Sequence, residues 1–315
     1  MKESKTILFA LRVAEKEDAE LLPKVAALAK ALDANVELYA VLLPLLYGSV
    51  GVYGELIDET QRTLKHQART ELETHASTLR LAGIMTSVSV SVDGRAHEAI
   101  ARRAEAPDVD LVVVGCRARH RLHGLLLYTD WELVRLCPKP LLLIKDAAPW
   151  QDGSVLAAID PGHEFDKPAD LDERILRRAS QMAAALGEPL HVVHAIAVPP
   201  EALIPEIAPY PAVVAEMRAA AIARAESNVD TLVKNTAVIV ERHLSTDLPA
   251  AAITRVAVAC GANLVVMGAM SRSMLRRWLL GDTALKVLDA LHADVMIVKP
   301  DISLRTRASL EATAA

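Results

Sequence analysis

The chain is a tandem duplication, because three short segments of its first half recur in the same order in its second half. The offsets between matching segments are 153, 154 and 148 residues, and loop insertions produce small differences of this kind. Repetition at a nearly fixed period identifies the unit that folds. The matching pairs are DLVVVG (110–115) with NLVVMG (263–268), KPLLLIK (139–145) with ADVMIVK (293–299), and TILFAL (6–11) with SVLAAI (154–159).

Short apolar runs alternate with longer helical patterns in each unit. Runs such as LVVVG and LVVMG are apolar throughout, which is typical of parallel strands with helices on both faces. Repeated strand–helix–strand units with right-handed crossovers predict a doubly wound sheet. We therefore expect an α/β protein of two tandem Rossmann-like domains, each a five-stranded parallel sheet with helices on both faces. The expected strands lie near 6–12, 36–42, 86–91, 110–115, 140–145, 154–160, 190–196, 237–243, 263–268 and 294–299, and the expected helices near 16–32, 56–82, 95–105, 129–137, 170–186, 212–234, 248–260 and 282–292.

The duplication predicts domains at 1–147 and 153–300. The segment DAAPWQDG at 146–153 combines proline, aspartate and glycine and is expected to be the linker. Residues 301–315 are polar and alanine-rich and are expected to form a flexible tail. With 52% hydrophobic but only 3% aromatic residues, the two cores must be mostly aliphatic.

Composition excludes several functional classes. A net charge of -5 gives no electrostatic basis for general nucleic-acid binding. The three cysteines lack CxxC spacing, so neither a disulfide framework nor a zinc–cysteine site is indicated. No apolar run reaches the length of a membrane span, and the first apolar run is too short for a signal peptide. We therefore expect a cytoplasmic protein.

The loop after the fourth strand of the second unit can be interpreted in two ways. Gly268 ends the strand, a basic loop follows, and Gly281, Asp282 and Thr283 open a helix. The free N–H groups and dipole of a helix start favour an anion, so this arrangement predicts a phosphate site. In the alternative, Gly268 is a turn residue, and Asp282 or Thr283 only caps the helix.

At these residues the chain resembles the universal stress proteins, whose ATP-binding signature is Gly-x2-Gly-x9-Gly-(Ser/Thr). Gly268, Ser271 and Gly281 stand at that spacing, and the strand ending AAID at 157–160 resembles the family's first strand, whose terminal aspartate contacts adenine. The resemblance spans about 1–145 and 153–300, and the two-copy form is similar to the tandem, E-type branch.

This resemblance implies an adenine nucleotide alpha hydrolase-like fold and an adenine nucleotide, such as ATP with Mg²⁺, in the second domain. Two positions depart from the signature there. Ser271 replaces the second glycine, and Asp282 replaces the last hydroxyl residue, so that a metal ion or Thr283 would have to compensate. The implied nucleotide-binding residues are Asp160, Val193, Gly268, Ser271, Gly281, Asp282 and Thr283.

The first domain departs further from the signature. Its matching positions are Gly115, Ala118, Tyr128 and Thr129, and a tyrosine in place of glycine removes both space and backbone freedom. Arg12 stands where the adenine-binding aspartate is expected, which replaces a hydrogen-bond acceptor by a donor. We expect this nucleotide site to be inactive.

Two further features have alternative interpretations. The basic loop at 117–123 could bind an acidic partner, or its charges could simply be solvated. The apolar segments 41–57 and 196–214 could line a pocket for a lipid-like ligand, or pack within the protein. His191 and His194 are three residues apart on one expected strand, so they face opposite sides and cannot bind one metal ion together.

Universal stress proteins often dimerise through their last strands. By resemblance, 140–145 (Pro140–Lys145) and 294–299 (Asp294–Lys299) are expected to make that pairing inside one chain as a pseudo-dimer, and two chains could form a homodimer. No catalytic constellation and no metal motif is present in the sequence. We expect a stress-response protein that is non-catalytic or weakly ATP-binding through its second domain, at most a slow ATPase. The alternatives are a carrier of an apolar or amphiphilic ligand and a protein–protein scaffold.

Overall fold

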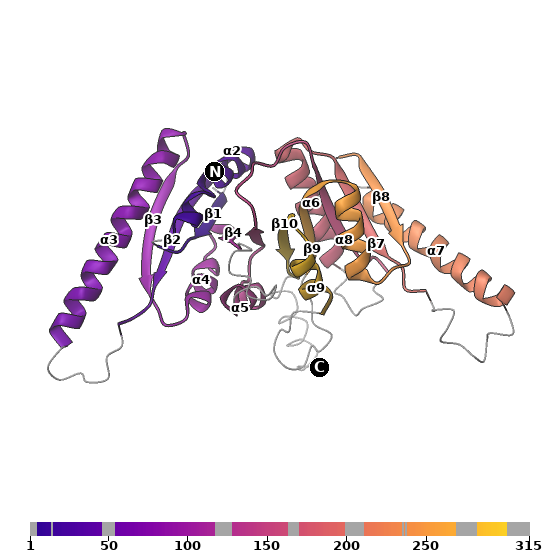
Figure 1. Ribbon diagram of the computed structural model, residues 1–315. Coiled ribbons are helices and arrows are strands. Elements are labelled where there is room, and N and C mark those ends of the chain that lie inside the picture. Colours follow the sequence, from indigo (N-terminus) through magenta and orange to yellow (C-terminus); the bar gives the residue numbers. More distant parts are fainter. Residues whose placement is uncertain are drawn as a thin grey trace, which may run out of the picture.

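One sheet contains all ten strands that the structure describes (Figure 1). The computed structural model describes residues 5–13, 15–45, 54–116, 128–162, 170–198, 211–234, 236, 238–268 and 282–300. The first half contributes β1 (Lys5–Ala10), β2 (Ala34–Leu42), β3 (Thr86–Val92), β4 (Val109–Gly115) and β5 (Leu141–Ile144). The second half contributes β6 (Ser154–Ile159), β7 (Leu190–Ala195), β8 (Val240–Ser245), β9 (Ala262–Gly268) and β10 (Asp294–Val298).

The strand order is β3-β2-β1-β4-β5-β10-β9-β6-β7-β8, so the second half repeats the order of the first in mirror sequence. All pairings within each half are parallel, as the repeated strand–helix–strand pattern predicts. The two halves join where β5 pairs with β10, and this pairing is antiparallel. The fold class is confirmed, and the pairing of the last strands inside one chain, which the resemblance implies, joins the two five-stranded sheets into one.

Helices cover both faces of this sheet. The described helices of the first half are α1 (Lys16–Ala19), α2 (Leu22–Leu32), α3 (Gly54–Leu81), α4 (Ala96–Ala104) and α5 (Tyr128–Leu136). Those of the second half are α6 (Leu171–Leu186), α7 (Pro211–Val233), α8 (Pro249–Ala259) and α9 (Asp282–Ala290). Side chains of α2, α3, α6 and α7 share one buried apolar cluster with one face of the strands, and those of α4, α5, α8 and α9 share the cluster on the other face. Each cluster contains residues of both halves, so the core is continuous across the β5–β10 junction.

Two expected elements differ from the observed ones. The helix expected at 16–32 is divided into α1 and α2, because Pro23 stands in the first turn of α2 and lacks the N–H that a continuous helix needs. The strand expected at 237–243 is found at Val240–Ser245. There the register against β7 sets the strand limits, and Ile239, just outside the strand, is 95% exposed although it is apolar.

A buried polar cluster holds the linker against the junction. The Asp294 carboxylate accepts hydrogen bonds from the Lys145 backbone N–H at 2.7 Å and from Trp150 Nε1 at 2.8 Å. Lys24 Nζ lies 2.7 Å from Asp294 Oδ2 and 4.6 Å from the centre of the Trp150 ring. Burial raises the pKa of the Asp294 carboxyl, while Lys24 opposes this effect. The Asp294 carboxylate of the second half thus binds Lys24 and Lys145 of the first half and Trp150 of the linker.

Two lysines at matching positions tie the halves together reciprocally. Lys145, after β5, donates to the carbonyls of Leu288 and Leu291 at the end of α9, at 2.5 and 2.8 Å. Lys299, after β10, donates to the carbonyl of Arg135 near the end of α5 at 2.8 Å. The last carbonyls of a helix have no partner within the helix and carry its negative dipole end, so each ammonium caps a helix of the opposite half.

Candidate functional site

The carboxyl ends of β6 and β9 bring two of the predicted site residues to one edge of the sheet. β6 and β9 are neighbours, with Ala158 opposite Met267, so Asp160 and Gly268 follow paired positions. Helix α9 begins at Asp282, as predicted, and it leads into β10, the other neighbour of β9. Ligands of parallel sheets bind beyond this edge.

Asp160 lies in a buried group of ionisable side chains. It is 5% exposed, and its backbone N–H donates to Asp172 Oδ1 of α6 at 2.9 Å. His194 Nδ1 lies 4.0 Å from Asp160 Oδ1 and 3.2 Å from the carbonyl oxygen of Ile159. Sequence patterns do not connect His194 of β7 or Asp172 of α6 with Asp160, because the three residues come together only through strand pairing and helix packing.

The first half uses the same backbone contact with a different side chain. The Arg12 N–H donates to Asp18 Oδ2 at 2.8 Å, as the Asp160 N–H does to Asp172. Here the guanidinium of Arg12 also binds Asp18, through Nε at 3.1 Å and Nη2 at 3.0 Å, and its Nε lies 3.2 Å from Glu15 Oε2. Asp18 follows Arg12 by 6 residues and Asp172 follows Asp160 by 12, so the equivalence of the two aspartates becomes visible only in the structure.

The glycines at the ends of β4 and β9 are explained by helix packing. A Cβ at Gly268 would lie 2.9 Å from Leu171 Cδ2 and 3.2 Å from Ile175 Cδ1 of α6. A Cβ at Gly115 would lie 2.7 Å from Leu21 Cδ1 and 2.8 Å from Asp18 Oδ1. A side chain at either strand end would force these neighbours to shift, so packing favours glycine there even without a ligand.

Val193 has a core environment. It is 1% exposed in the middle of β7, among apolar side chains on the α8 face. Tyr128 and Thr129 open α5, of which only the backbone is described at these two residues. Asp282 and Thr283 likewise open α9 with undescribed side chains. Outside the described residues lie Ala118, Ser271 and Gly281, the rest of the basic loop at 117–123, residues 46–53 of the segment 41–57, and residues 199–210 of the segment 196–214.

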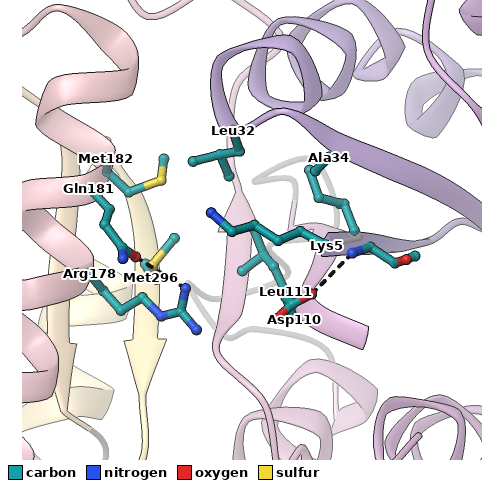
Figure 2. Close-up of a pocket in the computed structure, with 11 residues that line it drawn as sticks. Lys5, Leu32, Ala34, Asp110, Leu111, Arg178, Gln181, Met182 and Met296 are labelled. Carbon is teal, nitrogen blue, oxygen red and sulfur yellow. Dashed lines mark hydrogen bonds between the residues drawn. The ribbon is translucent and has the colours of Figure 1, made fainter. Parts of the chain in front are cut away.

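A small crevice lies between the two halves, away from the carboxyl edge (Figure 2). Arg178, Gln181 and Met182 of α6 face Lys5, Asp110 and Leu111 of the first half across it, with Met296 of β10 alongside. Burial lowers the pKa of the Arg178 guanidinium, and Asp110 opposes this effect. The volume is about 30 Å³, enough for one or two water molecules and far too small for a nucleotide or a lipid.

The comparison with known families accounts for the duplicated fold. The model of the universal stress protein family matches residues 3–145 and again residues 155–299. The chain belongs to the universal stress protein family. The two matches correspond to the two halves of the sheet, and the junction strands β5 and β10 lie within them.

Known universal stress proteins are similar to the chain over most of its length. Universal stress protein E of Salmonella typhi is 29% identical over 77% of this chain and 75% of its own. Universal stress protein E of Photorhabdus laumondii is 30% identical over 77% of this chain and 76% of its own. The crystal structure of a universal stress protein from Archaeoglobus fulgidus superposes with a TM-score of 0.66 at 16% identity, covering 95% of this chain and 99% of that one. No described helix is long and apolar enough to cross a bilayer.

Proposed function

We propose that the chain acts in the stress response and binds an adenine nucleotide in its second half alone. The observation that carries this asymmetry is the residue after the first strand of each half. Asp160 supplies a carboxylate there, whereas the matching Arg12 is bound to Asp18 through two guanidinium nitrogens. A carboxylate can accept a hydrogen bond from the amino group of adenine, and a guanidinium cannot.

The phosphates would lie between the end of β9 and the start of α9. By the family signature, the backbone N–H groups of Gly268, Ser271 and Gly281 would bind the phosphate chain together with the positive end of the α9 dipole. Thr283 would supply the hydroxyl of the family signature. Asp282 is a carboxylate beside these phosphates, so Mg²⁺ between them would remove the repulsion.

The test transfers the tyrosine of the first half into the second. In the Gly281→Tyr variant we expect the affinity for ATP to fall at least tenfold, because the phenol fills the phosphate cradle and the residue loses glycine's backbone freedom. Isothermal titration calorimetry with MgATP measures the affinity. The matched control is Tyr128→Phe, at the corresponding place in the first half, with wild-type affinity expected.

The outcome that contradicts the proposal is an unchanged ATP affinity in Gly281→Tyr, or an equal loss in both variants. Gly115→Tyr is not a useful control, since a side chain at Gly115 would collide with Leu21 and Asp18 and perturb the fold.

We further propose that the domains span residues 1–147 and 153–300 and that residues 301–315 form a tail. We also propose that the protein is cytoplasmic and that two chains form a homodimer.

A further inference from the structure

Two imidazoles and a carboxylate meet on one face of the sheet at its outer end. His191 lies on β7, and Glu241 and His243 lie on the terminal strand β8. In the register, His191 is opposite Glu241 and Val193 is opposite His243. Alternate residues of a strand share a face, so all three side chains project on the face that α8 covers.

Their ligand atoms have the spacing of a metal site. His191 Nδ1 lies 2.9 Å from His243 Nε2 and 3.7 Å from Glu241 Oε2, and His243 Nε2 lies 4.0 Å from Glu241 Oε1. A tetrahedral zinc ion with bonds of about 2.0–2.1 Å holds its ligands about 3.4 Å apart. The three observed distances lie on both sides of this value, so small side-chain rotations would bring the two imidazole nitrogens and one of the two Glu241 oxygens to a single ion.

The first half shows what occupies the same place without histidines. The registers align His191 with Glu37, and His243 with Ser89. There the carboxylate of Glu37 accepts hydrogen bonds from Ser89 and from Arg103, whose Nε lies 3.1 Å away. Counted back from the paired strands β4 and β9, the residue that matches Arg103 is Val256, which is buried. The first half therefore has a carboxylate paired with a guanidinium at this place. The second half has His191, His243 and Glu241 there, with Val256 at the position of the arginine.

We propose that His191, Glu241 and His243 form a zinc site. Two histidines and a carboxylate are an established ligand set for Zn²⁺, and imidazole ligands select zinc over magnesium or calcium. In the metal-free chain the two imidazoles share one hydrogen bond between Nδ1 and Nε2, so zinc binding requires the proton to move to the other nitrogen of its ring.

Three protein ligands would leave the fourth position of a tetrahedral zinc ion to a water molecule. The His191 side chain is 11% exposed and that of His243 25%, whereas that of Glu241 is 69% exposed, so the ion would reach the site from the side of Glu241. His191 and Glu241 are the second residues of β7 and β8 and His243 is the fourth residue of β8, whereas the proposed nucleotide site lies beyond the carboxyl ends of β6 and β9. Bound zinc would cross-link the edge strand to its neighbour and stabilise the folded chain.

The test uses untagged full-length protein stripped of metal with EDTA and titrated with ZnSO₄ by calorimetry. We expect the wild type to bind one more zinc ion than His243→Ala and His191→Ala do. Glu241→Gln changes an exposed residue that the fold does not need, and we expect it to weaken this binding by roughly tenfold or more. His66→Ala, an exposed histidine of α3, is the matched control and should bind as the wild type does.

Two secondary measurements separate metal binding from loss of fold. Circular dichroism of each metal-free variant reports folding, and visible absorption of Co²⁺ in place of zinc reports a tetrahedral site, which should be lost in His243→Ala. The proposal is overturned if the wild type binds no zinc, or if His243→Ala and Glu241→Gln bind it with wild-type stoichiometry and affinity. The imidazoles would then be a hydrogen-bonded pair only. Neither outcome bears on ATP binding at the opposite edge.

Discussion

Lys299 is a charged side chain held inside the protein. It is 6% exposed, and its Nζ donates to the Arg135 carbonyl at the end of α5. Burial lowers the pKa of this ammonium from 10.5 to about 8, because removal from water disfavours the charged form. The hydrogen bond from Lys299 to the end of α5 therefore joins the two halves, but burying the charged ammonium costs free energy.

This shift predicts how stability changes with pH. Below pH 8 the lysine is charged in both the folded and unfolded chains, so the cost of burial is fully present. Between pH 8 and 10.5 the folded chain holds the neutral amine while the unfolded chain still binds the proton, so the lysine's contribution to stability rises. Relative to Lys299→Met, the free energy of unfolding of the wild type should rise across this range by at most about 3 kcal/mol.

Urea unfolding at four pH values from 7 to 10 measures this difference. Lys65→Met changes an exposed lysine of α3 and should show no comparable trend. A difference between wild type and Lys299→Met that stays constant with pH would show that Lys299 titrates normally in the folded chain.

At the scale of elements, the approach of a helix to a strand end determines where glycine is required. Helix α6 lies against the end of β9. Asp18 of α1 and Leu21, just before α2, lie against the end of β4. The sequence leaves Gly268 either in a phosphate loop or in a turn, and the structure adds that its missing side chain makes room for Leu171 and Ile175. At Gly115 the neighbouring atoms include the Asp18 carboxylate that binds Arg12.

Alanine substitutions at these glycines should destabilise the protein unequally. We expect Gly268→Ala to cost roughly 1–2 kcal/mol, because the ends of Leu171 and Ile175 can shift, and Gly115→Ala to cost more, roughly 2–3 kcal/mol, because Asp18 is held in place. Gly94→Ala is the control, since no atom lies within 4 Å of its Cβ position. Thermal and urea unfolding give the values. Equal stabilities for all three variants would contradict this view of the strand ends.

At the scale of the whole molecule, β5 and β10 protect each other. Leu141, Leu142 and Leu143 pair with Ile297, Met296 and Val295, and these six side chains are fully buried or nearly so. Separating the halves would expose an apolar strand edge with unpaired N–H and C=O groups, which is a template for association with another chain. The pairing therefore makes one chain the equivalent of a dimer.

We expect a chain of residues 1–147 to self-associate. Its β5 edge should pair with a second copy, because the antiparallel pairing in the full chain already joins two similar units. Size-exclusion chromatography with light scattering would show dimers or larger species, while Asp152→Asn in the full chain, an exposed linker change, leaves the oligomeric state unaltered. A folded, monomeric 1–147 chain would contradict the prediction.

The sequence by itself determined the duplication, the α/β class and most strands and helices. These properties follow from local patterns. An entirely apolar run such as LVVVG at 111–115 is typical of a strand inside a sheet that helices cover on both faces. Resemblance added the family and the pairing of the last strands. Local patterns also misled, because Pro23 divides a helix that hydrophobic periodicity makes continuous.

Only the tertiary structure decided which distant side chains meet. His191 faces away from His194, as period-two alternation predicts, but its partner His243 is 52 residues away and becomes a neighbour only through the register of β7 against β8. Arg12 and Asp160 differ in chemistry in the sequence, yet their common backbone contact with Asp18 and Asp172 depends on where the next helix packs. Register and packing are long-range properties, and a single sequence does not contain the distances that they set.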